Sequence, residues 1–225
     1  MAGPTITKET TVPNHVTNRI TVTGDAQSVA ELFAGCFRKQ KPEVPDCWHA
    51  RAKDQSIPEE KRAEWQERIA KREAEEPFDV FDFGMIIPVP AFIANGSDGL
   101  VSGSREDQTG RNWYRFNSEA WGTKWNAYDL AIQENSDGRL VFKFDTAWSE
   151  PHPVIAQLMR WFPELHITHE FFDEGHCFYG YRRFHGGRNV DDNYQTEKET
   201  APGLFRRLCR ELKGYDPEEN DDSDE

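Results

Sequence analysis

The segment Tyr179–Phe184 carries side chains that could bind single-stranded nucleic acid. Tyr179 and Tyr181 lie two residues apart, so in a strand both rings point to one face, where bases can stack. Arg182 and Arg183 follow and add positive charge that could contact phosphates. Two interpretations are open: a stacking platform on an open sheet, or an aromatic pair packed under a helix or loop. We favour the packed pair, because the residues before it lack the basic residue and glycine of the RNA-recognition strand.

A second candidate group lies in the tryptophan-rich segment 121–126. Trp121 and Trp125 each offer a large π-face and one hydrogen-bond donor, which suits a pocket for a base or a small ligand. Lys124 and Asn126 have the opposite parity from Trp125, and a buried Asn126 would need backbone partners. The alternative, which we favour, is an aromatic cluster that joins a helix at 112–121 to a sheet. All four residues are candidate binding residues under the first interpretation.

One segment, 166–185, concentrates histidine and cysteine, but their spacing does not suit a metal site. His166 and His169 are three residues apart and therefore point to opposite faces of a strand. No HExxH or CxxC motif accompanies them, and no GxSxG motif marks a nucleophile. Several carboxylates alternate out of the expected strands toward solvent: Asp79, Asp82, Asp129 and Asp145. We therefore predict no metal, no cofactor and no catalytic residue.

The net charge of −13 is distributed unevenly along the 225 residues. Residues 215–225 hold seven acidic side chains and no basic one, so residues 1–214 carry −6. Such an acidic stretch, poor in apolar residues, cannot fold alone, and we predict a disordered acidic tail at 214–225. The mildly acidic remainder argues against bulk attraction to nucleic acid or an anionic membrane. Imitation of a phosphate backbone is disfavoured too, because it needs charge spread over a folded face.

The sequence shows no apolar run long enough to span a bilayer and no secretory signal at its N-terminus. Its four cysteines are scattered without a CxxC pair, which fits a reducing compartment. We therefore expect a cytoplasmic protein that does not bind membranes.

The elements that would position these side chains alternate between strands and helices. Apolar alternation predicts strands at 16–22, 81–87, 128–132, 140–148, 165–171 and 177–184. Helical spacing predicts helices after Asp25, at 112–121, after Pro151 and at 202–213, with an inserted charged helix at about 56–76. This order favours an α+β sandwich of ferredoxin-like topology, with a mostly antiparallel sheet and helices on one face. We expect an N-terminal extension at 1–15, this domain at 16–187, and a linker plus C-terminal amphipathic helix at 188–213.

Several of these segments together resemble one known family. Asn112-Trp113-Tyr114 and the stretch Trp121-Gly122-Thr123-Lys124-Trp125-Asn126-Ala127 look like the signature of YubB-type ferredoxin-like proteins of conjugative plasmids and bacteriophages. Further matching pieces are Asn18-Arg19-Ile20, residues 144–149 and residues 161–165. The resemblance spans about residues 16–185 and leaves out 38–77 and the C-terminal helix. It implies a ferredoxin-like domain, a mobile-element origin and a cytoplasmic setting, and it offers no activity or catalytic residue to carry across.

Two functional hypotheses follow from these observations. The leading one is a non-enzymatic accessory protein of a phage or plasmid that binds a host macromolecule, with a host protein as partner and a role in countering host defence. Its expected contact surfaces are the 56–76 helix, a loop at 94–111 and the C-terminal helix. The alternative is a single-stranded nucleic-acid-binding protein that uses Tyr179, Tyr181, Arg182 and Arg183.

Overall fold

The structure is a computed structural model that describes residues 14–94 and 113–217. Most of the extension expected at 1–15, of the loop expected at 94–111 and of the tail expected at 214–225 lies outside these residues. The described chain forms two compact units. Phe37–Phe81 make up a hairpin unit, and the remaining described residues make up a sheet unit.

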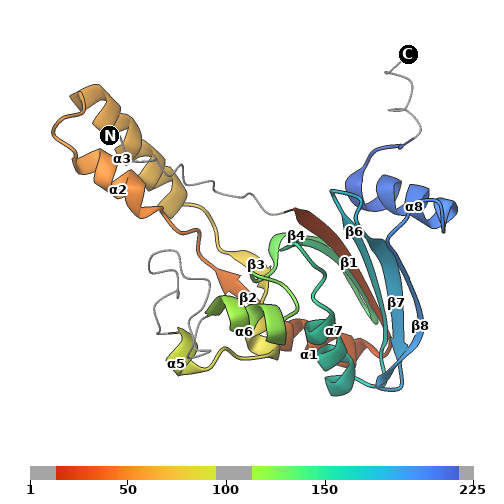
Figure 1. The fold of residues 1–225 in the computed structure, drawn as a ribbon. Coiled ribbons are helices and arrows are strands. Elements are labelled where there is room, and N and C mark those ends of the chain that lie inside the picture. The colour runs from red at the N-terminus through yellow and green to blue at the C-terminus, as the bar shows by residue number, and fades with distance from the viewer. Residues whose placement is uncertain (1–13, 95–112, 218–225) are drawn as a thin grey trace, which may run out of the picture. The chain divides into compact units, whose positions relative to one another are not determined.

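The sheet unit is built on a six-stranded antiparallel sheet in the order β4-β5-β1-β6-β7-β8 (Figure 1). Its strands are β1 (His15–Thr23), β4 (Tyr128–Ser136), β5 (Arg139–Ala147), β6 (His166–Asp173), β7 (Tyr179–His185) and β8 (Arg188–Gln195). The central strand β1 pairs with β5 on one side and with β6 on the other. The expected α+β fold with an antiparallel sheet is therefore confirmed.

Successive side chains of the central strands point alternately to the two faces of the sheet. On β1, Val16, Ile20 and Val22 are fully buried on one face. Helices α1 (Ala26–Cys36), α4 (Phe83–Ile86) and α7 (His152–Trp161) lie against this face (Figure 1). Two further helices of the unit are α5 (Ala91–Ala94) and α6 (Trp113–Ala120). The Phe83 ring packs edge-on against Phe144 of β5, at 6.0 Å between centroids, and so anchors α4 to the core.

The opposite face of the sheet is covered at one end by the C-terminal helix. This helix comprises α8 (Pro202–Leu208) and the π-helical turn η1 (Cys209–Lys213). Its apolar side packs in one buried cluster that consists of Phe172, Tyr179, Phe205, Leu208, Cys209 and Leu212. Around the cluster, Glu170 of β6 accepts hydrogen bonds from Arg19 and Arg207, so charge pairs also join the helix to the sheet. The C-terminal helix is therefore part of the core, whereas its sequence predicted a contact surface outside the domain.

Strand β8 (Arg188–Gln195) replaces part of the linker that was expected at the start of the segment 188–213. Gly186 and Gly187 have positive φ angles of 61° and 72°, and they connect β7 to β8 as a tight hairpin turn. The strand itself is polar and mostly exposed, as an edge strand can be, and for that reason the apolar alternation did not reveal it.

The strand expected at 81–87 is also different in the structure, because its second half forms helix α4. Asp82 accepts a hydrogen bond from the Gly84 N–H at 2.9 Å and so caps the helix. Asn126 accepts one from the Phe83 N–H at 2.8 Å, which satisfies a second free donor of the first turn. These hydrogen bonds stabilise the first turn of α4. The segment is therefore helical, although its apolar side chains alternate as they would in a strand.

The hairpin unit contains strands β2 (Phe37–Gln40) and β3 (Phe78–Phe81), which pair antiparallel, and helices α2 (Asp46–Lys53) and α3 (Glu59–Glu73). Helix α3 lies within the charged helix expected at about 56–76. Trp48 and Trp65 face each other across the two helices at 5.9 Å, and the Arg68 guanidinium lies over both rings. Neither of the two described helices contains a fully buried residue.

Candidate binding surface

The tryptophan-rich segment forms a loop between α6 and β4 that four side chains hold in place. The Trp121 indole is buried and donates to the Ile87 carbonyl at 2.9 Å. Thr123, also buried, donates through its hydroxyl to the Ala147 carbonyl at 2.8 Å. The Asn117 amide donates to the Lys124 carbonyl at 2.9 Å. The loop backbone is therefore fixed by contacts to α6, to β5 and to the segment after α4.

Asn126 is the remaining anchor of this loop. Its Oδ1 accepts from the N–H groups of Phe83, at 2.8 Å, and of Ala127, at 3.0 Å. Its Nδ2 donates to Asp82 Oδ1 at 2.9 Å. These N–H groups are the backbone partners that an inward Asn126 was expected to need. Trp121 and Asn126 thus support the loop and are not free to bind a ligand.

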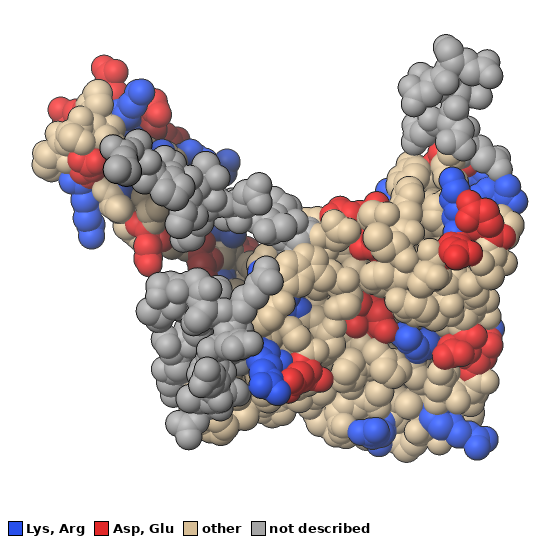
Figure 2. Space-filling view, in the orientation of Figure 1, with Lys and Arg blue, Asp and Glu red and all other residues tan. Residues whose placement is uncertain are grey.

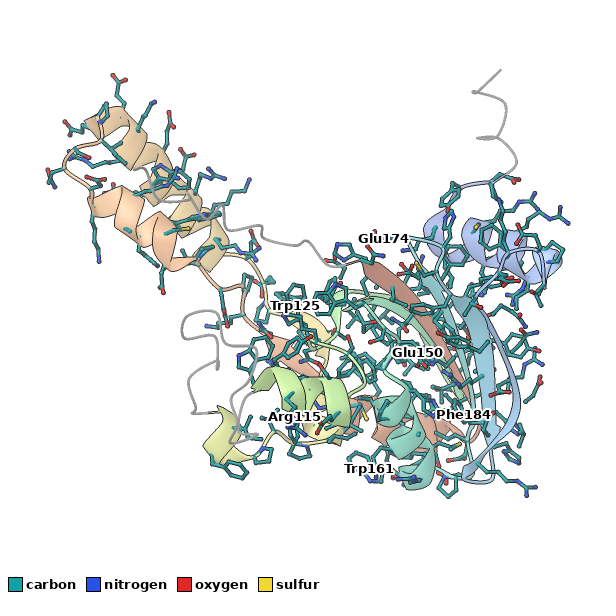
Figure 3. The ribbon with its side chains drawn as sticks, in the orientation of Figure 1. Arg115, Trp125, Glu150, Trp161, Glu174 and Phe184 are labelled. Carbon is teal, nitrogen blue, oxygen red and sulfur yellow. The ribbon has the colours of Figure 1, made fainter. Side chains whose placement is uncertain are left out.

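Lys124 and Trp125 are the two side chains that the anchored loop displays. The Lys124 Nζ lies 4.6 Å from the ring centroids of both Trp125 and Trp148, and 6.0 Å from that of Tyr114. These distances are within the range of cation–π attraction. The three rings come from the loop, from the end of β5 and from α6, and they keep 37%, 39% and 42% of their surface exposed. We call these four residues the aromatic–lysine surface; Trp125 is labelled in Figure 3.

Trp148 enters this surface from a strained backbone position. Its φ is 70°, in the left-handed region that bulky residues seldom occupy. Its N–H donates to the Asn14 carbonyl at 2.9 Å, which helps to hold the conformation. A large exposed side chain that is held in a sparsely populated conformation is a feature often found at functional sites.

The surroundings of the aromatic–lysine surface are acidic. Tyr128 packs edge-on against Trp125 at 6.3 Å. The pKa of Tyr128 is raised by burial and then by the nearby Asp145, Asp129 and Glu174. Figure 2 shows Lys and Arg interspersed with Asp and Glu on the visible face of the sheet unit, with no continuous basic stripe. This arrangement does not favour a polyphosphate backbone.

The four residues of the expected nucleic-acid site do not all lie on one face of the sheet. Tyr179 is fully buried under α8 and donates to the Glu197 carbonyl at 3.0 Å. Tyr181 is half-buried on the same face, with the Arg183 guanidinium 4.5 Å from its ring centroid. Arg182 points to the other face, because neighbouring residues of a strand alternate, and it binds Glu150. Tyr179 is therefore packed under α8, which is the arrangement that the sequence favoured over a stacking platform.

The histidines of this part of the chain are dispersed. His166 and His185 stack at the exposed ends of β6 and β7, with ring centroids 3.8 Å apart, while His169 is buried on the face that α7 covers. Within residues 14–94 and 113–217, no three His, Cys, Asp or Glu side chains are grouped so that they could hold a metal ion. None of the described helices is long and apolar enough to cross a membrane.

Sequence reasoning identified part of the aromatic–lysine surface. It named Lys124 and Trp125 as candidates, but it assigned no role to Trp148 or Tyr114. No spacing rule connects Tyr114 to Trp148, because the two rings meet only through the packing of α6 beside the end of β5. They lie edge-on at 6.3 Å.

Comparison with known proteins supports the fold of the second half of the chain. Residues 127–216 match the family model described as the ferredoxin-like domain in Api92-like protein. The crystal structure of protein api92 from Yersinia pseudotuberculosis is similar over 83% of this chain and 99% of its own, at 15% identity and a TM-score of 0.48. No curated protein matches the chain. The matched region extends to residue 216, so the C-terminal helix lies inside it, and the ferredoxin-like fold expected from the order of strands and helices is confirmed.

Proposed function

We propose that this chain is a non-enzymatic accessory protein that acts by binding a host protein through the aromatic–lysine surface. The observation that carries the proposal is the exposure of three large rings around one lysine on a rigidly anchored loop. Burial of such rings in an interface is favourable, and Trp and Tyr dominate the binding energy of many interfaces. We further propose a phage or plasmid origin and a role in countering host defence, which rest on the resemblance of the tryptophan motif.

The surface also suggests what the partner contributes. Among the residues that the structure describes, no carboxylate forms a salt bridge with Lys124, so its ammonium group is available to an acidic side chain of the partner. The flanking indoles would cover apolar side chains beside that acid. A protein segment with one acidic group among apolar residues fits this arrangement better than nucleic acid does, because a single lysine among acids attracts polyphosphate weakly.

The test is affinity capture from host lysate, followed by binding of the purified partner. The double variant Trp125→Ala/Trp148→Ala should lose capture. The matched control is Trp161→Ala, which removes an indole that is 45% exposed at the C-terminal end of α7 (Figure 3) and should retain capture. Equal capture by the double variant and wild type would contradict the proposed surface.

A second arm of the test separates protein from nucleic acid. Tryptophan fluorescence is titrated with a single-stranded oligonucleotide at low salt. Saturable quenching that disappears in the double variant would show that the aromatic–lysine surface binds single-stranded nucleic acid and not a protein. The Tyr179–Arg183 site would not be involved. Absence of quenching, together with selective capture of one protein, supports the proposal.

A further inference from the structure

Four polar side chains form a buried chain between the sheet and the start of α7. Asn18 on β1 and His169 on β6 are completely buried, and Glu150, just before α7, is 9% exposed. Arg182 of β7 completes the chain by donating to Glu150 Oε1. Glu150 is labelled in Figure 3, near the sheet. Buried polar groups normally have every hydrogen-bonding atom paired, so the atoms that lack a partner here are informative.

The orientation of Asn18 follows from its neighbours. Its Nδ2 donates to the Val16 carbonyl and to Thr146 Oγ1, each at 2.9 Å. Thr146 donates its own proton to the Ser149 carbonyl at 2.8 Å, so toward Asn18 it can only accept. The amide nitrogen must therefore face these two acceptors, and Oδ1 faces His169.

This orientation in turn fixes the tautomer of His169. Its Nε2 lies 2.9 Å from Asn18 Oδ1, and since Oδ1 can only accept, Nε2 carries the proton. In a neutral imidazole the second nitrogen, Nδ1, then has a lone pair. That nitrogen lies 3.8 Å from Glu150 Oε2. Within the described structure both atoms are buried without a hydrogen-bond partner, so two acceptors face each other.

We propose that Glu150 and His169 form a proton-binding site, in which neutral Glu150 donates its Oε2–H to His169 Nδ1 while Oε1 keeps Arg182. One proton satisfies both acceptors, and uptake draws the two atoms about 1 Å closer, to an ordinary hydrogen-bond length. Glu150 lies just before α7, and His169 lies on β6. Binding of the proton therefore makes the packing of α7 against the sheet depend on pH.

The proton belongs on Glu150 because an imidazolium would be a second buried cation beside Arg182. Burial lowers the pKa of His169 well below its usual value, and Arg182 and His152 lower it further. Burial raises the pKa of Glu150, against the opposing effect of Arg182. Charged and titratable groups face this site from each element packed against it: His152 of α7, Arg182 of β7, Asp173 of β6, and Asp192 and Tyr194 of β8.

The two shifts act on stability with opposite signs. The raised pKa of Glu150 contributes stability that is complete below its ordinary pKa of 4.5 and is lost as pH rises through the native pKa. The lowered pKa of His169 contributes stability above its ordinary pKa of 6.5 that is lost as pH falls. Between pH 4.5 and pH 6.5, buried His169 lowers the stability of the native state because it stays neutral. The stability gained when Glu150 binds a proton offsets part of this loss.

NMR titration of the full chain tests the site directly. The Glu150 carboxyl carbon should titrate with a midpoint above 4.5, and the His169 nitrogens should show a protonated Nε2 at neutral pH. The Nδ1 signal should shift together with the Glu150 carboxyl carbon. A Glu150 midpoint at or below 4.5, or a proton on Nδ1 at neutral pH, would overturn the proposal.

The Glu150→Gln variant is the second measurement, because its amide can donate permanently to His169 Nδ1 and still accept from Arg182. Unfolding of wild type and variant is compared from pH 4.5 to pH 8. The stability of the variant relative to wild type should rise with pH, since only wild type loses the proton. A difference that is independent of pH, or that falls as pH rises, would refute proton binding at Glu150.

Discussion

Replacing Phe205 with Ala tests whether the C-terminal helix belongs to the cooperative fold. Phe205 is 5% exposed, and its ring lies 5.2 Å from Tyr179 and 5.3 Å from Phe172. Loss of a buried phenyl group costs about 3–5 kcal/mol through lost transfer energy and the cavity that remains. A domain is stable by only about 5–15 kcal/mol, so this one substitution should remove a large fraction of the free energy of unfolding.

Urea unfolding followed by circular dichroism measures this loss. The matched control is Phe92→Ala, since Phe92 is 63% exposed and its removal should change stability by less than about 0.5 kcal/mol. Phe205→Ala could instead lower the free energy of unfolding by less than about 1 kcal/mol and leave its slope against urea concentration unchanged. In that case the C-terminal helix does not unfold together with the sheet. The C-terminal helix would then lie outside the cooperative core.

Three further predictions address the loop, the strained backbone and the thiols. Asn126→Ala should cost about 1–3 kcal/mol in thermal unfolding, because the Asn126 side chain that accepts from the N–H groups of Phe83 and Ala127 is removed; an unchanged melting temperature would contradict this. Trp148→Gly should be about 1 kcal/mol more stable than Trp148→Ala in urea, because only glycine adopts positive φ without strain, and equal stability would refute the argument. A thiol reagent should modify two cysteines in the native protein and four after denaturation, since Cys47 and Cys177 are exposed while Cys36 and Cys209 are buried. Burial raises the pKa of Cys36 to about 12, so modification of Cys36 in the native state would contradict the structure.

Much of the fold could be predicted from local pattern. Alternation in β1, β5, β6 and β7 and helical spacing in α1 and α7 are properties of short segments that bury one face. Strand β8 and helix α4 could not be predicted in this way. The first is a polar edge strand that exists because β7 offers it hydrogen bonds, and the second depends on caps that include Asn126, more than forty residues away.

The candidate site shows the same division. Sequence reasoning selected Lys124 and Trp125 because of the tryptophan motif, but it could not tell an anchoring side chain from a displayed one. Trp121 and Trp125 have the same chemistry, and only the packing of the Trp121 indole against the Ile87 carbonyl separates their roles. Tyr179 and Tyr181 have the spacing of a stacking pair, yet α8 covers one of them from a distant part of the chain.

The sequence by itself determined the fold class, the acidic balance and the tryptophan-rich loop, because these depend on composition and on short-range periodicity. The tertiary structure decided which side chains are exposed, which polar atoms are paired and which distant residues meet. Asn18, Glu150, His169 and Arg182 have no shared pattern along the chain and come together only because β1, β6 and β7 are neighbours and α7 covers them. Contacts between residues far apart in sequence leave no periodic signal, so the protonation of that buried group is a property of the folded protein alone.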